Sequence, residues 1–172
     1  TNDTAIILAP ANKTPVSDES DIEHFSQALL QLLESLSVML VRDGEGTTKC
    51  VTVRVRGALS VEDAKKASRS IAESLLVKTA LFGEDPNWGR VACAAGYSGA
   101  EMHEDKLTID IENISLLENG VPVEYSDKDI REILSRKSFV ITVNLGLGEH
   151  SFSFLTSDLS YDYVKINAEY ST

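Results

Sequence analysis

The segment LFGEDPNWGRVACAAGYSG, residues 81–99, sets the local structure in the middle of this chain. Pro86 disfavours helical backbone at the residue before it and fixes its own φ angle, so the sequence predicts a turn here. Asn87 is a suitable N-cap for a short helix from about residue 88 to residue 95. Small side chains cover much of that helix, and Gly96 suits its C-terminal end. We therefore expect close packing here, against protein or ligand.

Length and composition describe a folded globular protein. The chain has 172 residues, of which 42% are apolar, enough for a sizeable core in one domain or two small ones. Its formal net charge of −11 argues against a surface that follows nucleic-acid phosphates, because such surfaces need clustered Lys and Arg. No apolar stretch approaches the length of a membrane span. The expectation is a soluble, cytoplasmic protein that binds neither nucleic acid nor membrane.

The cysteines and histidines form no recognisable site. Cys50 and Cys93 lie in apolar surroundings without metal-ligand spacing, so both are expected to be reduced and buried. His24, His103 and His150 are scattered over different elements and are expected on the surface. No metal site is predicted.

The rest of the chain alternates between helical and strand patterns. Helical spacing predicts an amphipathic helix from residue 21 to about residue 41 that buries a Leu-rich face, and a second helix that starts at Ser60 and buries Leu75. A further helix is expected at 126–134. Strands are expected at 4–9, 50–55, 107–111, 114–117, 121–123, 139–145 and 151–156. The tail 158–172 is too rich in large apolar side chains to stay solvated, so it should dock.

These elements follow one another without a regular βαβ repeat. Asn119-Gly120 predicts a tight turn in a hairpin, and the strands at 139–145 and 151–156 are expected to form another hairpin. We therefore predict an α+β fold with layered helices and mixed, mostly antiparallel sheets. Two subdomains are expected: an α/β part at residues 1–99, and a hairpin-rich part with a docked tail at residues 100–172.

Thr1 suggests one kind of chemistry. An N-terminal threonine can use its hydroxyl as a nucleophile and its own α-amine as the base. A cut or truncated terminus explains the same residue. An N-terminal-nucleophile hydrolase therefore stays open as one function, and a non-catalytic interaction module, built on the docked tail and the small-residue helix, stays open as another.

The loop DGEGTTK, residues 43–49, is the best internal candidate for a site. The glycines on either side of Glu45 permit backbone conformations that turn its carboxylate toward a cavity, where it can pair with a substrate ammonium group. A helix-ending turn with solvated charges is the alternative. Glu84 and Asp85 add two carboxylates, which can act as an acid–base pair or as structural anchors of the turn.

Three segments together resemble the C-terminal part of the β chain of the ornithine acetyltransferase family, which includes bifunctional glutamate N-acetyltransferases. They are DGEGTTK at 43–49, LVKTALFGEDPNWGRVACAAGYSG at 76–99 and DLSYDYVKINAEYST at 158–172. The likeness covers nearly the whole chain in the right order. It implies the fold of that β chain, and an enzyme of arginine biosynthesis in the cytoplasm.

The resemblance implies transfer of an acetyl group from N-acetylornithine to glutamate through an acyl-enzyme, without a cofactor, and with acetyl-CoA as a further donor in some members. Members cleave themselves into α and β chains that assemble as α2β2. Their substrate contacts in β fall on Glu45, Asn167 and Thr172 of this chain. Glu45 is expected to meet a substrate ammonium group, while the Asn167 amide and the Thr172 hydroxyl bind other polar groups.

One departure from the family matters for catalysis. The family's nucleophile lies in an Ala-Thr-Met-Leu context, upstream of a segment that TNDT at residues 1–4 resembles. Thr1 is then not the nucleophile, and we assign no catalytic residue to this chain. The start of the β chain and the whole α chain are expected to be missing. Alone, the chain is expected not to transfer acetyl groups.

Overall fold

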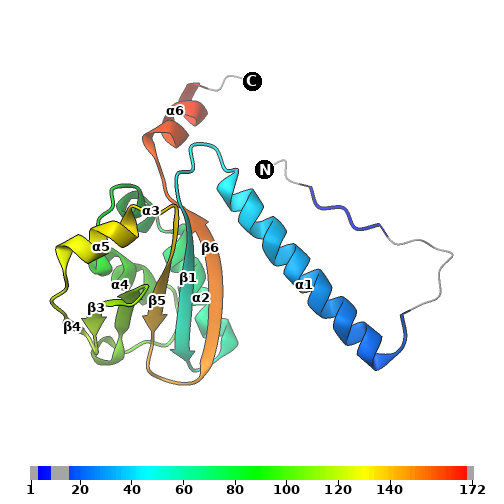
Figure 1. Ribbon diagram of the computed structural model, residues 1–172. Helices are drawn as coiled ribbons and strands as arrows, with labels where there is room; N and C mark the ends of the chain where they lie inside the picture. The colour runs from blue at the N-terminus through cyan, green and yellow to red at the C-terminus, as the bar shows by residue number, and fades with distance from the viewer. Residues whose placement is uncertain (1–3, 9–15, 170–172) are drawn as a thin grey trace. The chain divides into compact units, whose positions relative to one another are not determined.

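The structure, a computed structural model, describes residues 4–8 and 16–169 (Figure 1). The chain falls into two compact units, residues 1–36 and residues 37–172. The first unit holds most of helix α1 (Glu19–Arg42), and the second unit holds a six-stranded sheet with its helices. The expected division into residues 1–99 and 100–172 stays a prediction.

Helix α1 has the predicted helical structure but not the predicted burial. None of its residues is buried, and its large apolar side chains, such as Phe25 and Leu33, are exposed. Burial needs a covering element, and the described part of the first unit contains no other helix or strand. The expected strand at 4–9 is also wrong over residues 4–8, which have neither helical nor strand structure; residue 9 lies outside the described residues.

The same helix corrects an expectation about membranes. By length and composition alone, α1 is apolar enough to cross a membrane, a property that it shares with core helices of soluble proteins. Its charged side chains are concentrated near its two ends, and Glu34 is the one charged residue in the mostly apolar stretch between them. The expectation that no stretch approaches this length is therefore wrong for α1.

The sheet confirms the α+β prediction. Its strands are β1 (Cys50–Ala58), β2 (Thr108–Ile111), β3 (Ile114–Glu118), β4 (Val121–Pro122), β5 (Ser138–Asn144) and β6 (His150–Ser157), in the order β4-β3-β2-β5-β1-β6. Only β1 and β5 run parallel; the other neighbours are antiparallel. The β3–β4 hairpin forms as predicted, with Asn119 and Gly120 at positive φ in its turn.

The second predicted hairpin is wrong, because β1 lies between β5 and β6 (Figure 1). The valines that alternate along β1 are fully buried, and the strand pairs on both sides, as a central strand does. The connection from β5 to β6 instead passes over the end of β1. There Leu145 N–H donates to the Arg56 carbonyl at 2.9 Å, and Leu147 N–H donates to the Gly57 carbonyl at 2.8 Å. Local turn residues do not reveal an inserted strand.

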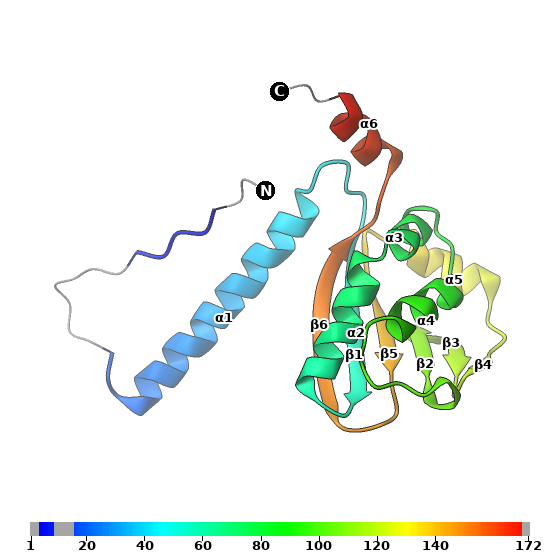
Figure 2. The ribbon, with the colours of Figure 1, turned by 180° about the vertical axis from the view of Figure 1, so that it is seen from behind.

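Helices α2 (Val61–Glu73), α3 (Leu75–Phe82) and α4 (Trp88–Gly96) lie on one face of the sheet (Figure 2), and α5 (Asp127–Leu134) follows β4. The predicted Asn87 cap forms, since Asn87 accepts from Arg90 N–H at 3.1 Å, and Ser60, where a helix was expected to start, caps α2 by accepting from Asp63 N–H at 3.1 Å. Leu75 is exposed rather than buried, because Ser74 ends α2 and caps α3, which turns the chain before Leu75.

The two cysteines differ in environment. Cys50 is buried, as expected, and burial raises the pKa of its thiol, which Arg42 partly offsets. Cys93 is exposed, against expectation, because the buried face of α4 consists of Val91, Ala94 and Ala95 instead. The three histidines are exposed, as predicted.

Candidate substrate-binding site

The structure brings together two of the three residues predicted to bind substrate. Asn167 lies in helix α6 (Tyr161–Glu169), and its Nδ2 donates to Glu45 Oε2 at 3.2 Å across a separation of 122 residues. Nδ2 also donates to the Tyr163 carbonyl at 2.9 Å, so both amide hydrogens are engaged. Glu45 and Asn167 are both exposed, and thus accessible to a ligand. Thr172 lies outside the described residues.

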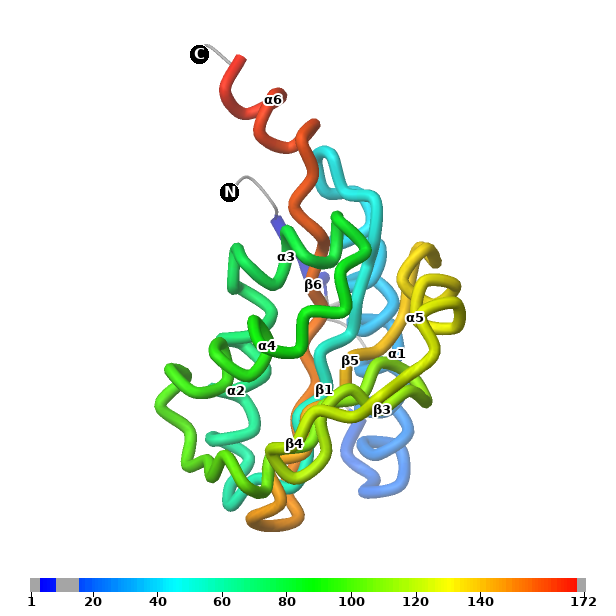
Figure 3. The backbone as a smooth tube through the Cα atoms, turned by 90° about the vertical axis from the view of Figure 1, so that its left-hand side faces the viewer, coloured from blue at the N-terminus to red at the C-terminus, as the bar shows by residue number. Residues whose placement is uncertain are grey.

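A tight turn after α1 places Glu45. Asp43 N–H continues the helical pattern by donating to the Met39 carbonyl at 3.0 Å, and Thr47 N–H then closes the turn on the Gly44 carbonyl at 3.0 Å. Gly46 has φ +66°, which glycine adopts without strain. The chain therefore leaves the helix and passes directly beside the start of α6 (Figures 1 and 3).

The tail docks through its first residues and not through its large side chains. Asp158 and Ser160 are buried, whereas none of the residues of α6 is buried. Tyr161 is 82% exposed, although its ring meets Phe82 edge-on at 5.2 Å between centroids. The predicted docking of the tail is thus wrong for Tyr161 and Tyr163, which are exposed, and Tyr170 lies outside the described residues. The short polar residues before α6 make the attachment.

An ion pair connects the loop at 43–49 to the turn before α4. Lys49, whose side chain is only 8% exposed, places Nζ 2.9 Å from Glu84 Oε1. Glu84 has φ +55°, an unusual conformation for a residue with a side chain, so the pair holds strained backbone in place. Asp85 instead accepts from Asn87 Nδ2 at 3.0 Å. The two carboxylates therefore act as separate structural anchors and do not form an acid–base pair.

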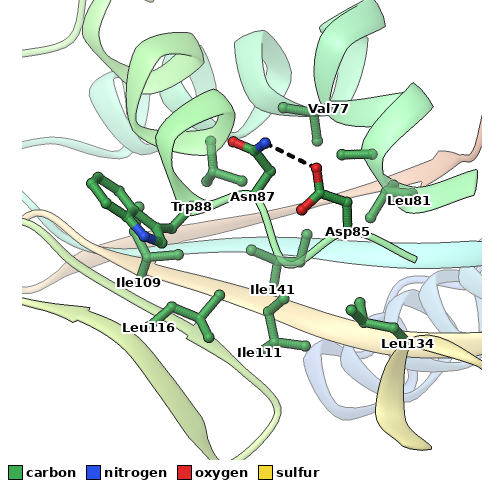
Figure 4. Close-up of a pocket in the computed structure, with 12 residues that line it drawn as sticks. Val77, Leu81, Asp85, Asn87, Trp88, Ile109, Ile111, Leu116, Leu134 and Ile141 are labelled. Atoms are coloured by element: carbon green, nitrogen blue, oxygen red, sulfur yellow. Dashed lines mark hydrogen bonds between the residues drawn. The ribbon is translucent and has the colours of Figure 1, made fainter. Parts of the chain in front are cut away.

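Residues 81–99 pack against the rest of the protein. The cavity beneath them measures about 10 Å³, room for no more than one water molecule. Trp88 lies against the sheet beside Ile109 and Leu116, with Asp85 and Asn87 at the polar edge (Figure 4). Residues 81–99 thus support the fold, and the candidate site lies in the loop at 43–49 and the tail.

A larger cavity of about 400 Å³ adjoins the loop. Three cations line it, Arg42, Lys49 and Lys137, together with Thr47, Thr48 and Cys50. Its size suits a small ligand, but the Lys49 ammonium already pairs with Glu84. Among residues 4–8 and 16–169, no group of His, Cys, Asp and Glu is arranged to hold a metal ion.

Lys49, Asp158 and Ser160 lie within the segments that the sequence singles out, but no role was predicted for any of the three. Ser160 had a readable signal, since a serine three residues before Tyr163 at the start of a helix is a typical N-cap. Asp158 and Lys49 had none. A charged side chain that is buried and paired looks the same in sequence as one in solvent.

Comparisons with known proteins agree with this architecture. Residues 1–172 match the sequence profile of the ArgJ family. The chain is 46% identical over 177 residues to the arginine biosynthesis bifunctional protein ArgJ of Geobacter sulfurreducens, and 43% identical over 180 residues to the glutamate N-acetyltransferase of Methanocaldococcus jannaschii. Both alignments cover 100% of this chain but only 45% and 44% of those proteins, so the chain spans less than half of their length.

The fold matches as well. The crystal structure of the arginine biosynthesis bifunctional protein ArgJ from Bacillus halodurans superimposes with a TM-score of 0.87 at 39% sequence identity. The match covers 92% of this chain and 75% of that chain. With a family profile that matches from end to end and a closely similar solved structure, the chain belongs to the ArgJ family.

Proposed function

We propose that this chain forms part of a glutamate N-acetyltransferase and supplies one side of its amino-acid site. The reaction moves an acetyl group from N-acetylornithine to glutamate through an acyl-enzyme and gives N-acetylglutamate and ornithine. The observation that carries the proposal is the contact between Glu45 and Asn167, two residues at family substrate-contact positions that lie far apart in sequence. The name of the Methanocaldococcus jannaschii relative, glutamate N-acetyltransferase, supports the reaction.

The geometry suits an amino-acid substrate. Asn167 occupies Oε2 of Glu45, so Oε1 is the oxygen that we assign to a substrate ammonium group. Because both amide hydrogens of Asn167 are engaged, its Oδ1 is oriented as an acceptor for a substrate N–H. Thr172 is the third proposed contact. Because Glu45 is exposed, pairing its carboxylate with an ammonium group needs no prior burial of that carboxylate.

The nucleophile is proposed to lie in the part of the family's sequence that this chain does not cover. Support comes from the coverage, since the relatives are more than twice as long as the aligned region. We propose that a self-cleaving precursor supplies this part as an α chain and the beginning of β, that the assembly is a cytoplasmic α2β2 heterotetramer, and that acetyl-CoA is a further donor. No cofactor is assigned.

Acetyl transfer by the complete enzyme and by the isolated chain tests this proposal. We expect the complete enzyme, with its α chain and the start of β, to move labelled acetyl from N-acetylornithine to glutamate. The isolated 172-residue chain should show no transfer above background, because it lacks the nucleophile. Failure of the complete enzyme contradicts the proposed reaction, and transfer by the isolated chain contradicts the placement of the nucleophile and revives Thr1.

A further inference from the structure

Two buried polar side chains join the loop at 43–49 to the tail. Asp158 and Ser160 are each 3% exposed, although the site residues that they adjoin, Glu45 and Asn167, are exposed. An ionised carboxylate is costly to bury unless hydrogen bonds replace its lost water. The hydrogen bonds of these two residues connect the loop at 43–49 to the tail.

Asp158 fixes the backbone at the end of the loop at 43–49. Its Oδ1 accepts from the N–H groups of Thr48 and Lys49, both at 2.9 Å, and its Oδ2 accepts from the Thr48 hydroxyl. The Asp158 N–H donates in return to the Lys49 carbonyl at 3.3 Å. On the other side of the tail, Leu159 N–H donates to the Lys78 carbonyl at 3.1 Å. Hydrogen bonds to a charged acceptor are stronger than neutral ones, so this is a firm attachment.

Ser160 links both partners of the Glu45–Asn167 contact. Its hydroxyl donates to the Gly46 carbonyl at 2.6 Å and accepts from Tyr163 N–H at 3.1 Å. Gly46 follows Glu45 directly, and the Tyr163 carbonyl accepts from the Asn167 amide at 2.9 Å. One buried hydroxyl therefore connects the backbone that carries Glu45 to the helical turn that orients Asn167.

Helix α6 has little else to hold it. None of its residues is buried, and the edge-on contact of Tyr161 with Phe82 leads to α3 and not to the loop, so apolar packing does not fix the register of α6 against the loop. The exposed hydrogen bond from Asn167 to Glu45, at 3.2 Å, contributes little by itself. The buried contacts of Asp158 and Ser160 are the ones that set the register.

We propose that Asp158 and Ser160 are positioning residues for acetyl transfer, holding loop 43–49 and α6 in the register that presents Glu45 and Asn167 together to the amino-acid substrate. This inference rests on the proposed function of Glu45 and Asn167. Neither residue touches the substrate itself. If the two residues served stability alone, their replacement would lower the stability of the protein. If they position the site, their replacement lowers kcat/KM, and the size of that decrease depends on whether Glu45 is present.

The first experiment measures steady-state kinetics of Ser160→Ala in the complete enzyme. We expect kcat/KM for N-acetylornithine to fall about tenfold, mainly through KM, because two hydrogen bonds that set the site are lost. Ser160→Thr keeps the hydroxyl and should retain most of the activity. Ser153→Ala is the matched control, since Ser153 is exposed on β6, and should leave kcat/KM unchanged. Unchanged kinetics in Ser160→Ala overturn the inference.

A double-mutant cycle with Glu45→Gln separates positioning from general destabilisation. If Ser160 acts through Glu45, the double variant should be little worse than Glu45→Gln alone. Effects that multiply overturn the inference. Asp158→Asn in the same cycle supplies the test if Ser160→Ala fails to fold, with Asp162→Asn on the exposed side of α6 as its control.

The cycle also separates the two proposals. If Glu45→Gln leaves kcat/KM unchanged, the proposed substrate site fails and the positioning role fails with it. If Glu45→Gln lowers kcat/KM but the second substitution has an independent effect, the substrate site stands and only the positioning role is overturned.

Discussion

Replacing Glu45 with alanine in the complete enzyme should lower kcat/KM for the amino-acid substrate at least tenfold. A carboxylate that meets an ammonium group makes a charge-assisted hydrogen bond, and removing the acceptor costs roughly 1.5 to 3 kcal/mol. Glu45→Gln should lower kcat/KM nearly as much, because the amide keeps the shape of the side chain but not its charge. Steady-state rates at varied N-acetylornithine and glutamate concentrations measure the effect.

Glu149→Ala is the control for this prediction. Glu149 is an exposed carboxylate in the β5–β6 connection, so its removal changes the net charge equally but leaves the loop intact. Its kcat/KM should equal that of the unmodified enzyme. Equal activity of the Glu45 and Glu149 variants removes Glu45 from the site.

Replacing Gly46 with alanine should damage both the site and the stability. A Cβ atom at this position would lie 2.4 Å from the Tyr163 backbone nitrogen, so the first turn of α6 must move away from the loop. The φ of +66° adds a strain of about 1–2 kcal/mol for a residue with a side chain. We expect kcat/KM to fall at least tenfold and the Tm to fall as well.

Gly99 offers a control that separates the clash from the strain. It has φ +77°, but a Cβ atom there meets nothing within 4 Å. Gly99→Ala should therefore lower the Tm by its strain alone and leave kcat/KM unchanged. If kcat/KM falls by the same factor in the Gly46 and Gly99 variants, the site does not depend on close packing of α6 against the loop.

Local signals in the sequence were sufficient where neighbouring residues determine the structure. The Ser60 and Asn87 caps, the alternating valines of β1 and the turn at Asn119-Gly120 were all predictable, because each depends on contacts within a few residues. The pairing of β1 between β5 and β6 was not, since it joins segments from opposite ends of the chain. The α1 apolar pattern predicts burial but does not say what covers the helix.

The candidate site was likewise predictable only in part. The resemblance supplied Glu45, Asn167 and Thr172, and the structure adds that the first two are in contact. What holds them is not visible in sequence. The side chain of Asp158 bonds to residues about 110 positions away, and no spacing rule reaches that far.

A crystal structure of the complete enzyme with bound ornithine would show whether Glu45 and Asn167 together receive the amino-acid substrate. We expect an ornithine nitrogen within about 3.2 Å of a Glu45 carboxylate oxygen, with Asn167 in contact with the same ligand. Ornithine bound at the nucleophile with neither Glu45 nor Asn167 in contact with it would contradict this proposal.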